Sequence, residues 1–178
     1  MIIAREKFNN NIVEYILYMY QTEDLIRANH FDPVELEKNL ISKFTLPENQ
    51  MDELREWYGN LIKQMIKEEI TVSGHLTSLK ELIFKLNDFH IQLINTLQEE
   101  KYLELYKWAS GFIIELKEKM KMPEITEIEV CINGLYGYML LKLKNTDISQ
   151  ETSQVMAVFS QLLRYLAVKY HDVNNLKI

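Results

Sequence analysis

A line of polar side chains bordered by tyrosines is the most chemically suggestive pattern in the chain. It runs along residues 10–27, where a helix turning by about 100° per residue would gather it into one narrow strip on an otherwise apolar surface. Such a strip favours the floor of a small-ligand pocket, because a few polar groups among apolar walls orient a bound molecule. The strip holds Asn10, Glu14, Gln21 and Asp24, and Tyr15, Tyr18 and Tyr20 border it.

Arg27 adds a cation to this strip. Glu23 precedes it by four residues and Asp24 by three, so either carboxylate can pair with the guanidinium on one helix face. The alternative is that the strip faces solvent and Arg27 makes a surface ion pair that contributes little to stability. Enclosure of these side chains in a cavity would favour the first reading. The expected ligand-binding set is Glu14, Tyr15, Tyr18, Gln21, Asp24, Arg27 and His90.

The four histidines lack the spacing of metal ligands. Di-iron helical bundles use Glu-x-x-His, which places a carboxylate and an imidazole on one face. No histidine here has an acidic residue three positions before it, and neither His-Glu-x-x-His nor Cys-x-x-Cys occurs. We therefore expect no metal and no cofactor. His90 lies on the apolar stripe of its helix, where its simplest role is a hydrogen-bonded core imidazole.

No residue has the surroundings of a catalytic nucleophile. Cys131, the one cysteine, lies in apolar company without a cationic neighbour, which indicates a structural thiol. Gly134 and Gly137 stand in a helical segment, where two glycines cost about 1–2 kcal/mol relative to alanine, so we expect close helix packing there. The sequence thus predicts no catalytic residues and leans toward a protein that is not an enzyme.

Apolar residues recurring at three- and four-residue intervals predict an all-α fold, a compact antiparallel bundle of about seven helices. The first, over roughly residues 4–29, is apolar nearly all round, which is typical of a central helix. The second runs from Pro33, capped by Asp32, to about Phe44. Later helices open at 45–48, after a break at 72–75 with Ser73 as cap, near Glu99, at 122–124, and near Asp147 or Ser149.

The composition favours one globular domain over residues 1–178. Twenty Lys and Arg stand against 26 Asp and Glu, a net charge of −6, and the basic residues are scattered, so we expect no nucleic-acid partner. Charge at the very start argues against a signal peptide, and no apolar run approaches the roughly 20 residues that span a bilayer. We expect a cytoplasmic protein that does not enter a membrane.

The first thirty residues also carry a resemblance. The segments Ile2-Ile3-Ala4-Arg5-Glu6-Lys7, Glu14-Tyr15-Ile16-Leu17-Tyr18-Met19 and Glu23-Asp24-Leu25-Ile26-Arg27 resemble the start of a family of uncharacterised bacterial proteins of about this length, known as a domain of unknown function. Gly74-His75-Leu76 is similar as well. The resemblance implies an all-helical cytoplasmic protein and brings no assigned activity, cofactor or catalytic residue.

Two functions remain open at this point. The first is a non-enzymatic helical bundle that acts through a protein partner or self-association, favoured by ten tyrosines, a residue type enriched at interfaces. The second is a small-ligand-binding protein or enzyme with its site on the first helix.

Overall fold

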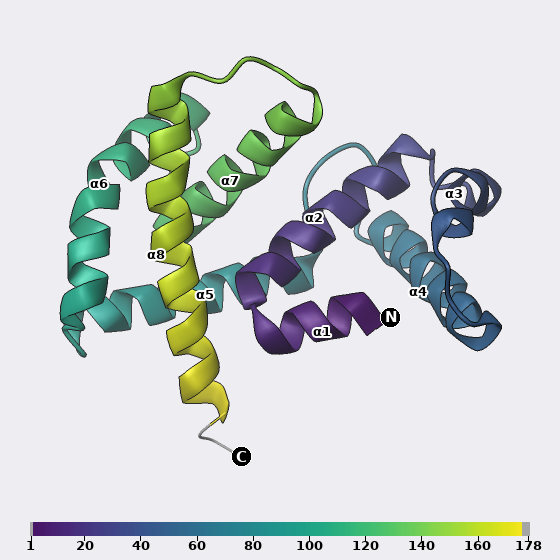
Figure 1. Ribbon diagram of the computed structural model, residues 1–178, viewed down its shortest axis with the longest axis horizontal. Coiled ribbons are helices and arrows are strands. Elements are labelled where there is room, and N and C mark those ends of the chain that lie inside the picture. Colours follow the sequence, from purple (N-terminus) through teal and green to yellow (C-terminus); the bar gives the residue numbers. More distant parts are fainter. Residues whose placement is uncertain (1, 176–178) are drawn as a thin grey trace. The chain divides into compact units, whose positions relative to one another are not determined.

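The structure is a computed structural model that describes residues 2–175 and the side chains of residues 3–173. In this part of the chain every regular element is helical, as expected for an all-α fold, and no strand occurs (Figure 1). There are eight α-helices and one 3₁₀ turn: α1 (Ile2–Asn10), α2 (Ile12–Ala28), α3 (Pro33–Asn39), η1 (Ile41–Lys43), α4 (Glu48–Lys67), α5 (Thr77–Asn95), α6 (Glu100–Met120), α7 (Glu127–Leu143) and α8 (Gln150–Asn175).

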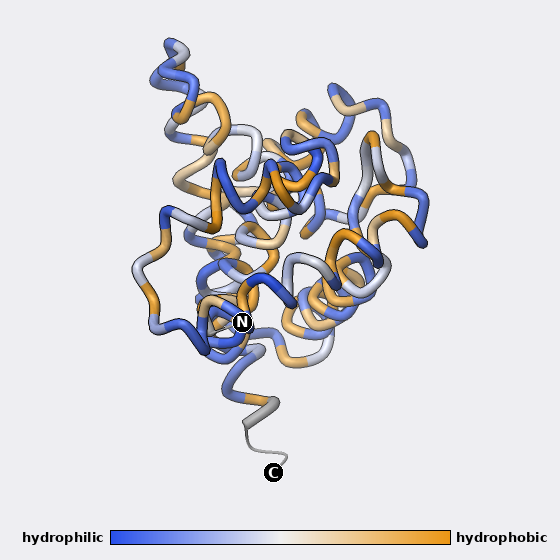
Figure 2. Tube along the Cα trace, turned by 90° about the vertical axis from the view of Figure 1, so that its right-hand side faces the viewer, coloured by the Kyte–Doolittle hydropathy of each residue, from blue (hydrophilic) through white to orange (hydrophobic). Residues whose placement is uncertain are grey.

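The helices pack into two compact units. Unit 1 comprises the described residues up to Asn10 together with Glu14–Lys80, and unit 2 comprises Asn11–Val13 together with the described residues from Glu81 onward. Figure 2 shows hydrophobic and hydrophilic residues alternating within single turns of the helices rather than in long blocks. Helices such as α4 and α5 have an apolar face to bury and a polar face for water.

The expected first helix is interrupted, which raises the number of helices above the seven expected. Asn11 separates α1 from α2, and its side-chain oxygen accepts a hydrogen bond from the backbone N–H of Val13 at 3.1 Å. An asparagine that bonds the chain two residues ahead caps a new helix instead of continuing the old one. The expectation of one helix over residues 4–29 was wrong because it gave apolar periodicity more weight than this cap.

Local caps explain where α3 and α8 begin. The Asp32 carboxylate accepts from the Val34 N–H at 2.8 Å, as the sequence predicted. The Ser149 hydroxyl, at one of the two starts expected for the last helix, accepts from the Thr152 N–H at 3.1 Å. Glu35, in the first turn of α3, lies with its Oε2 3.0 Å from His30 Nδ1. The second helix is also shorter than predicted, since α3 ends at Asn39 and is followed by η1.

The start of α7 lies one turn later than predicted. Thr126 is its cap, accepting from the Glu129 N–H at 3.3 Å, so the segment 122–124 precedes the helix. Glu127 and Glu129 then fall in the first turn, where the positive end of the helix dipole favours carboxylates.

Unit 2 is built around α6, α7 and α8, which contact one another. Their buried side chains include Tyr102, Ile113, Ile132 and Phe159. Gly134 of α7 lies at a close approach, because a Cβ atom there would come within 3.0 Å of Leu116 Cδ2 and 3.4 Å of the Phe159 ring. Close packing therefore accounts for Gly134. It does not account for Gly137, where a Cβ would meet nothing within 4 Å.

Candidate functional site

In unit 1 the Arg27 side chain is bound to backbone rather than open to solvent, with 13% of it exposed. Its Nη1 donates to Asp24 Oδ1 at 2.8 Å, which confirms the predicted i, i+3 pair. Its Nε and Nη2 donate to the carbonyl of Ile70 at 3.3 and 3.1 Å, and Nη2 also donates to the carbonyl of Gly74. Arg27 thus fastens the connection between α4 and α5 to α2.

Glu23, a carboxylate, also binds the connection between α4 and α5. Its side chain is fully buried, and one carboxylate oxygen accepts from the Leu76 N–H at 2.9 Å. The other lies 2.5 Å from His75 Nδ1, and the His75 ring stacks on Tyr20 with centroids 3.4 Å apart. A buried carboxylate with two such partners escapes the cost of an unpaired charge.

These contacts explain why α5 starts at Thr77 and not after Ser73. The Glu68 carboxylate accepts from the Thr77 N–H at 2.7 Å, and this hydrogen bond lowers the pKa of Glu68. Glu23 and Glu68 thus accept from the N–H groups of Leu76 and Thr77, which in most helices a neighbouring cap residue would satisfy. Side chains far away in the sequence replace the predicted Ser73 cap.

Three of the four remaining residues of the predicted set in unit 1 have partners within that unit. Glu14 is exposed and pairs with Lys7 at 3.3 Å, and Tyr15 packs edge-on against Phe8. Tyr18 stacks on Trp57 with ring centroids 6.4 Å apart. Gln21 is half-buried. These contacts are structural, and a ligand-binding role for this group stays a prediction.

His90, the last member of that set, belongs to unit 2 and is a hydrogen-bonded core imidazole, as expected. Its Nε2 lies 3.2 Å from Glu127 Oε2, and its Nδ1 lies 2.6 Å from the hydroxyl of Tyr102. A carboxylate only accepts, so in a neutral ring Nε2 carries the hydrogen and Tyr102 donates to Nδ1. Tyr106 donates to the second oxygen of Glu127 at 3.2 Å.

The pKa values in this network follow from burial and hydrogen bonding. The hydrogen bond from His90 lowers the pKa of Glu127, which is therefore ionised at neutral pH. Burial raises the pKa of Tyr102, and burial together with the hydrogen bond to Glu127 raises the pKa of Tyr106 to about 12. Both tyrosines are therefore neutral donors. Tyr106 donates to Glu127 directly, and Tyr102 donates to His90, which in turn donates to Glu127.

This network borders a pocket of about 340 Å³ formed by α5, α6 and the segment that leads into α7. Sequence reasoning named His90 but missed two residues that contact it. Glu127, 37 residues further along the chain, bonds its ring, and the ring of Tyr106, 16 residues further along, packs edge-on against it. No local pattern marks such a meeting, because it depends on how the helices pack. Besides these three, the pocket is lined by Asn87, Ile91 and Glu124 among others.

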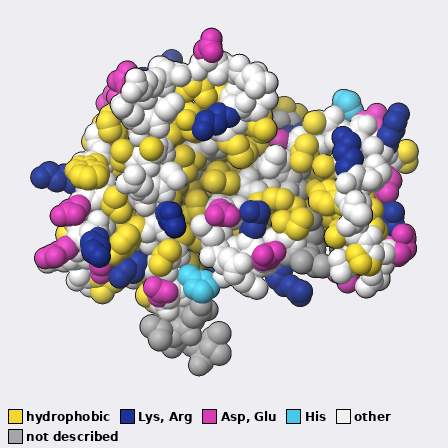
Figure 3. Space-filling view, viewed as in Figure 1, with side chains coloured by type: hydrophobic (Ala, Val, Ile, Leu, Met, Phe, Trp, Pro, Cys, Tyr) yellow, Lys and Arg dark blue, Asp and Glu magenta, His cyan; other side chains and the backbone are white. Residues whose placement is uncertain are grey.

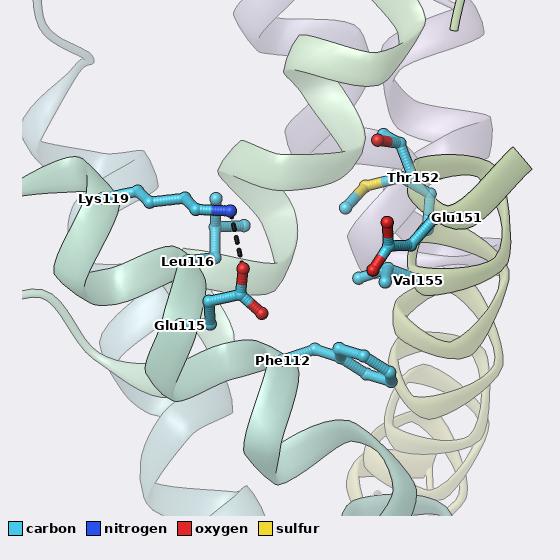
Figure 4. A pocket seen from close by; sticks show the side chains of 8 residues that line it. Phe112, Glu115, Leu116, Lys119, Glu151, Thr152 and Val155 are labelled. Atoms are coloured by element: carbon cyan, nitrogen blue, oxygen red, sulfur yellow. Dashed lines mark hydrogen bonds and ion pairs between the residues drawn. The ribbon is translucent and has the colours of Figure 1, made fainter. Parts of the chain in front are cut away.

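A second hollow, of about 190 Å³, lies between α6 and α8. Figure 4 shows Phe112 and Glu115 of α6 facing Glu151 and Val155 of α8 across it. Lys119 pairs with Glu115 at 2.6 Å at its edge. The walls are therefore mixed, apolar in the floor and carrying both signs of charge at the rim.

The face of α6 beside this hollow carries exposed aromatic side chains. Trp108 is 63% exposed, and Phe112, one turn further along the same face, is 36% exposed. On the side of the molecule seen in Figure 3, hydrophobic side chains lie among charged ones over α6 and α8. We call Glu104, Trp108, Gly111, Phe112, Glu115 and Lys119 the α6 face.

No cluster of three or more potential metal ligands occurs among residues 2–175. Cys131 is buried in α7, and burial raises the pKa of its thiol, in agreement with a structural role. A search of the described helices for one long and apolar enough to cross a membrane finds none.

Comparison with known families places the chain. The model of a family described as "Domain of unknown function (DUF4924)" matches residues 1–176, and the chain therefore belongs to this family. This confirms the resemblance inferred from the first thirty residues to a family of unknown function. No curated protein and no solved structure matches the sequence.

Proposed function

We propose that this member of the DUF4924 family is a non-enzymatic binding protein that pairs with a second copy of itself through the α6 face. The observation that carries the proposal is the exposure of Trp108, at 63%, beside Phe112 on one side of a helix. Tryptophan and other aromatic side chains dominate the energetics of protein interfaces, and Trp is the residue most enriched among hot spots. Pairing would remove both rings from water.

Gly111 supports a helix as the occupant of this face. It stands inside α6 on the same side as Trp108, and a Cβ atom there would meet nothing within 4 Å. An interior glycine costs a helix about 1 kcal/mol relative to alanine, and no close contact within the chain explains it. A missing side chain at the centre of an exposed face lets another backbone approach closely.

The charges on the α6 face favour a second copy of this chain as that helix. A two-fold axis that sets Gly111 of one copy against Phe112 of the other pairs the two α6 helices antiparallel. The same register sets Glu104 opposite Lys119, which also pairs with Glu115 of its own helix, and symmetry does so twice. Opposite charges therefore meet at both ends of the aromatic centre, although the whole chain has a net charge of −6.

Sedimentation velocity over a range of protein concentrations tests the proposal. The wild type should dimerise, and Trp108→Ala should weaken the dimer by about tenfold or more, the loss expected for an interface hot spot. Ile114→Ala is the matched control, because Ile114 is 58% exposed on another side of α6 and its loss should leave the dimer unchanged. A wild type that stays monomeric at the highest concentrations, or equal losses in both variants, would contradict self-association.

A charge exchange tests the register itself. Glu104→Lys and Lys119→Glu each place like charges opposite one another and should weaken the dimer, whereas the double variant restores opposite signs and should recover it. Failure of the double variant to recover would reject the antiparallel register while leaving self-association through Trp108 to the first experiment.

The proposal further takes residues 1–178 as one domain, an antiparallel bundle of helices that works in the cytoplasm. The single cysteine supports this location, because a lone buried thiol forms no disulfide within the chain and disulfides are rare in the reducing cytoplasm.

A further inference from the structure

The pocket beside His90 has the wall chemistry of a binding site and lies apart from the side chains of the α6 face. Its volume of about 340 Å³ is within the range of sites for small molecules. The Ile91 side chain and the Tyr106 ring supply apolar and aromatic surface, and Asn87, Glu124 and Glu127 supply polar groups. Apolar walls with a few polar groups are typical of ligand sites.

The charge of the lining is negative. Glu124 and Glu127 both line the pocket, and no Lys or Arg is among the residues that line it. The Nε2 hydrogen of His90 is directed to Glu127 and leaves that carboxylate ionised. Lys117 acts on Glu127 through space but is not part of the lining. An anionic ligand would meet two carboxylates here, whereas a cation would be attracted.

The N-terminus of α7 offers an anion fewer donors than an uncapped helix would. Helix N-termini bind anions through free backbone N–H groups. Here the Ile128 N–H donates to Asn87 Oδ1 at 3.5 Å and the Glu129 N–H donates to Thr126 Oγ1 at 3.3 Å. Two of the donors that would hold a phosphate or carboxylate are therefore already used by the protein.

Asn87 identifies a second requirement of the ligand. It is 8% exposed, and its amide oxygen is held by Ile128. Its amide nitrogen makes no hydrogen bond with a described residue. Every fully enclosed side-chain nitrogen and oxygen among the described residues has a partner, so this nitrogen is not fully enclosed. Because Asn87 lines the pocket, we infer that the nitrogen is accessible from it. This amide donor is therefore available to an acceptor atom of a molecule bound in the pocket.

We propose that this pocket binds a small organic cation, a protonated amine that also carries an oxygen acceptor and a short apolar carbon chain. The two carboxylates hold the ammonium group, with Glu127 fixed in place by His90 and Tyr106. The amide nitrogen of Asn87 donates to the oxygen of the ligand, and the carbon chain packs on Ile91 and the ring of Tyr106.

NMR titration of the ¹⁵N-labelled protein with three matched compounds tests this inference. 4-Aminobutan-1-ol carries the proposed ammonium and hydroxyl groups, butane-1,4-diol replaces the ammonium with a neutral hydroxyl, and 4-hydroxybutanoate replaces it with an anion. The amino alcohol should shift the side-chain amide signals of Asn87 and bind roughly tenfold more tightly than the diol, the difference expected for a charged hydrogen bond. The anion should not bind.

Variants separate the pocket from general attraction to an acidic protein. Glu124→Gln removes one exposed carboxylate of the lining and should weaken binding of the amino alcohol by several-fold. Glu118→Gln is the control, because Glu118 is an exposed carboxylate that lines a different pocket on α6. Equal affinity for the diol and the amino alcohol, or equal effects of the two variants, would overturn the proposal. Neither result depends on whether α6 pairs with a second copy.

Discussion

His90 joins the buried hydroxyl of Tyr102 to the partly exposed carboxylate of Glu127, a group that solvent protons can reach. Its ring bonds Tyr102 on one side and Glu127 on the other. The position of His90 on the apolar stripe of its helix was enough to predict a core imidazole. Its partners were not predictable, because Glu127 lies 37 residues away and reaches His90 only through helix packing.

We predict that Glu127 makes unit 2 less stable in acid. The pKa of its folded state is lower than the ordinary value of about 4.3, so the unfolded chain binds the proton more tightly. The stabilisation is complete above that ordinary value and is lost as the pH falls through the lower value of the folded state. Urea unfolding of the wild type and of Glu127→Gln at a series of pH values should show the wild-type advantage shrinking toward acid. An advantage independent of pH would contradict this role.

At the scale of elements, the structure separates helix ends set by neighbouring residues from those set by distant ones. The starts of α3 and α8 were predicted because Asp32 and Ser149 cap N–H groups two and three residues ahead. The start of α5 was not, because its partners include Glu23, 53 residues before Leu76. A sequence window that covers one helix contains the first kind of information and lacks the second.

The two glycines of α7 give a matched test of packing. Gly137→Ala adds a methyl group into open space and should stabilise the protein by about 1 kcal/mol, roughly 2–4 °C in the thermal midpoint. Gly134→Ala gains the same helix propensity but places Cβ 3.0 Å from Leu116 and 3.4 Å from the buried Phe159 ring. It should therefore fall short of Gly137→Ala by about 1 kcal/mol or more. Calorimetry of both variants measures the difference, and equal midpoints would mean that α7 and its neighbours relax freely.

At the scale of the whole molecule, the all-helical class was the firmest inference from sequence, since apolar periodicity fixes it residue by residue. Division into two compact units was not predicted, because no linker or change of composition marks it. One boundary lies between α1 and α2, and the other two fall within α2 and α5, where a helix gives no sequence signal that its neighbours change.

We predict that the two units nevertheless unfold together, as one domain does. Trp57 of unit 1 is half-buried and stacks on Tyr18, so its fluorescence in a Trp108→Phe variant reports unit 1. Cys131 is buried in unit 2, so its reaction with a thiol reagent during a brief pulse reports that unit. The two probes should give the same midpoint in urea. Separate midpoints would assign the units independent stability.

The way Glu23 and Glu68 complete the start of α5 has a consequence for the growing polypeptide on the ribosome. Glu23 leaves the exit tunnel long before Leu76, because 53 residues separate them. Until residues 75–77 emerge, the carboxylate that fits inside unit 1 lacks the imidazole and the amide that neutralise its burial. Arg27 likewise awaits the carbonyls of Ile70 and Gly74. Unit 1 should thus remain incompletely folded through most of its synthesis and reach its final packing only when its last dozen residues arrive, roughly 2–10 s after α2 itself has been translated, at about 5–20 residues per second.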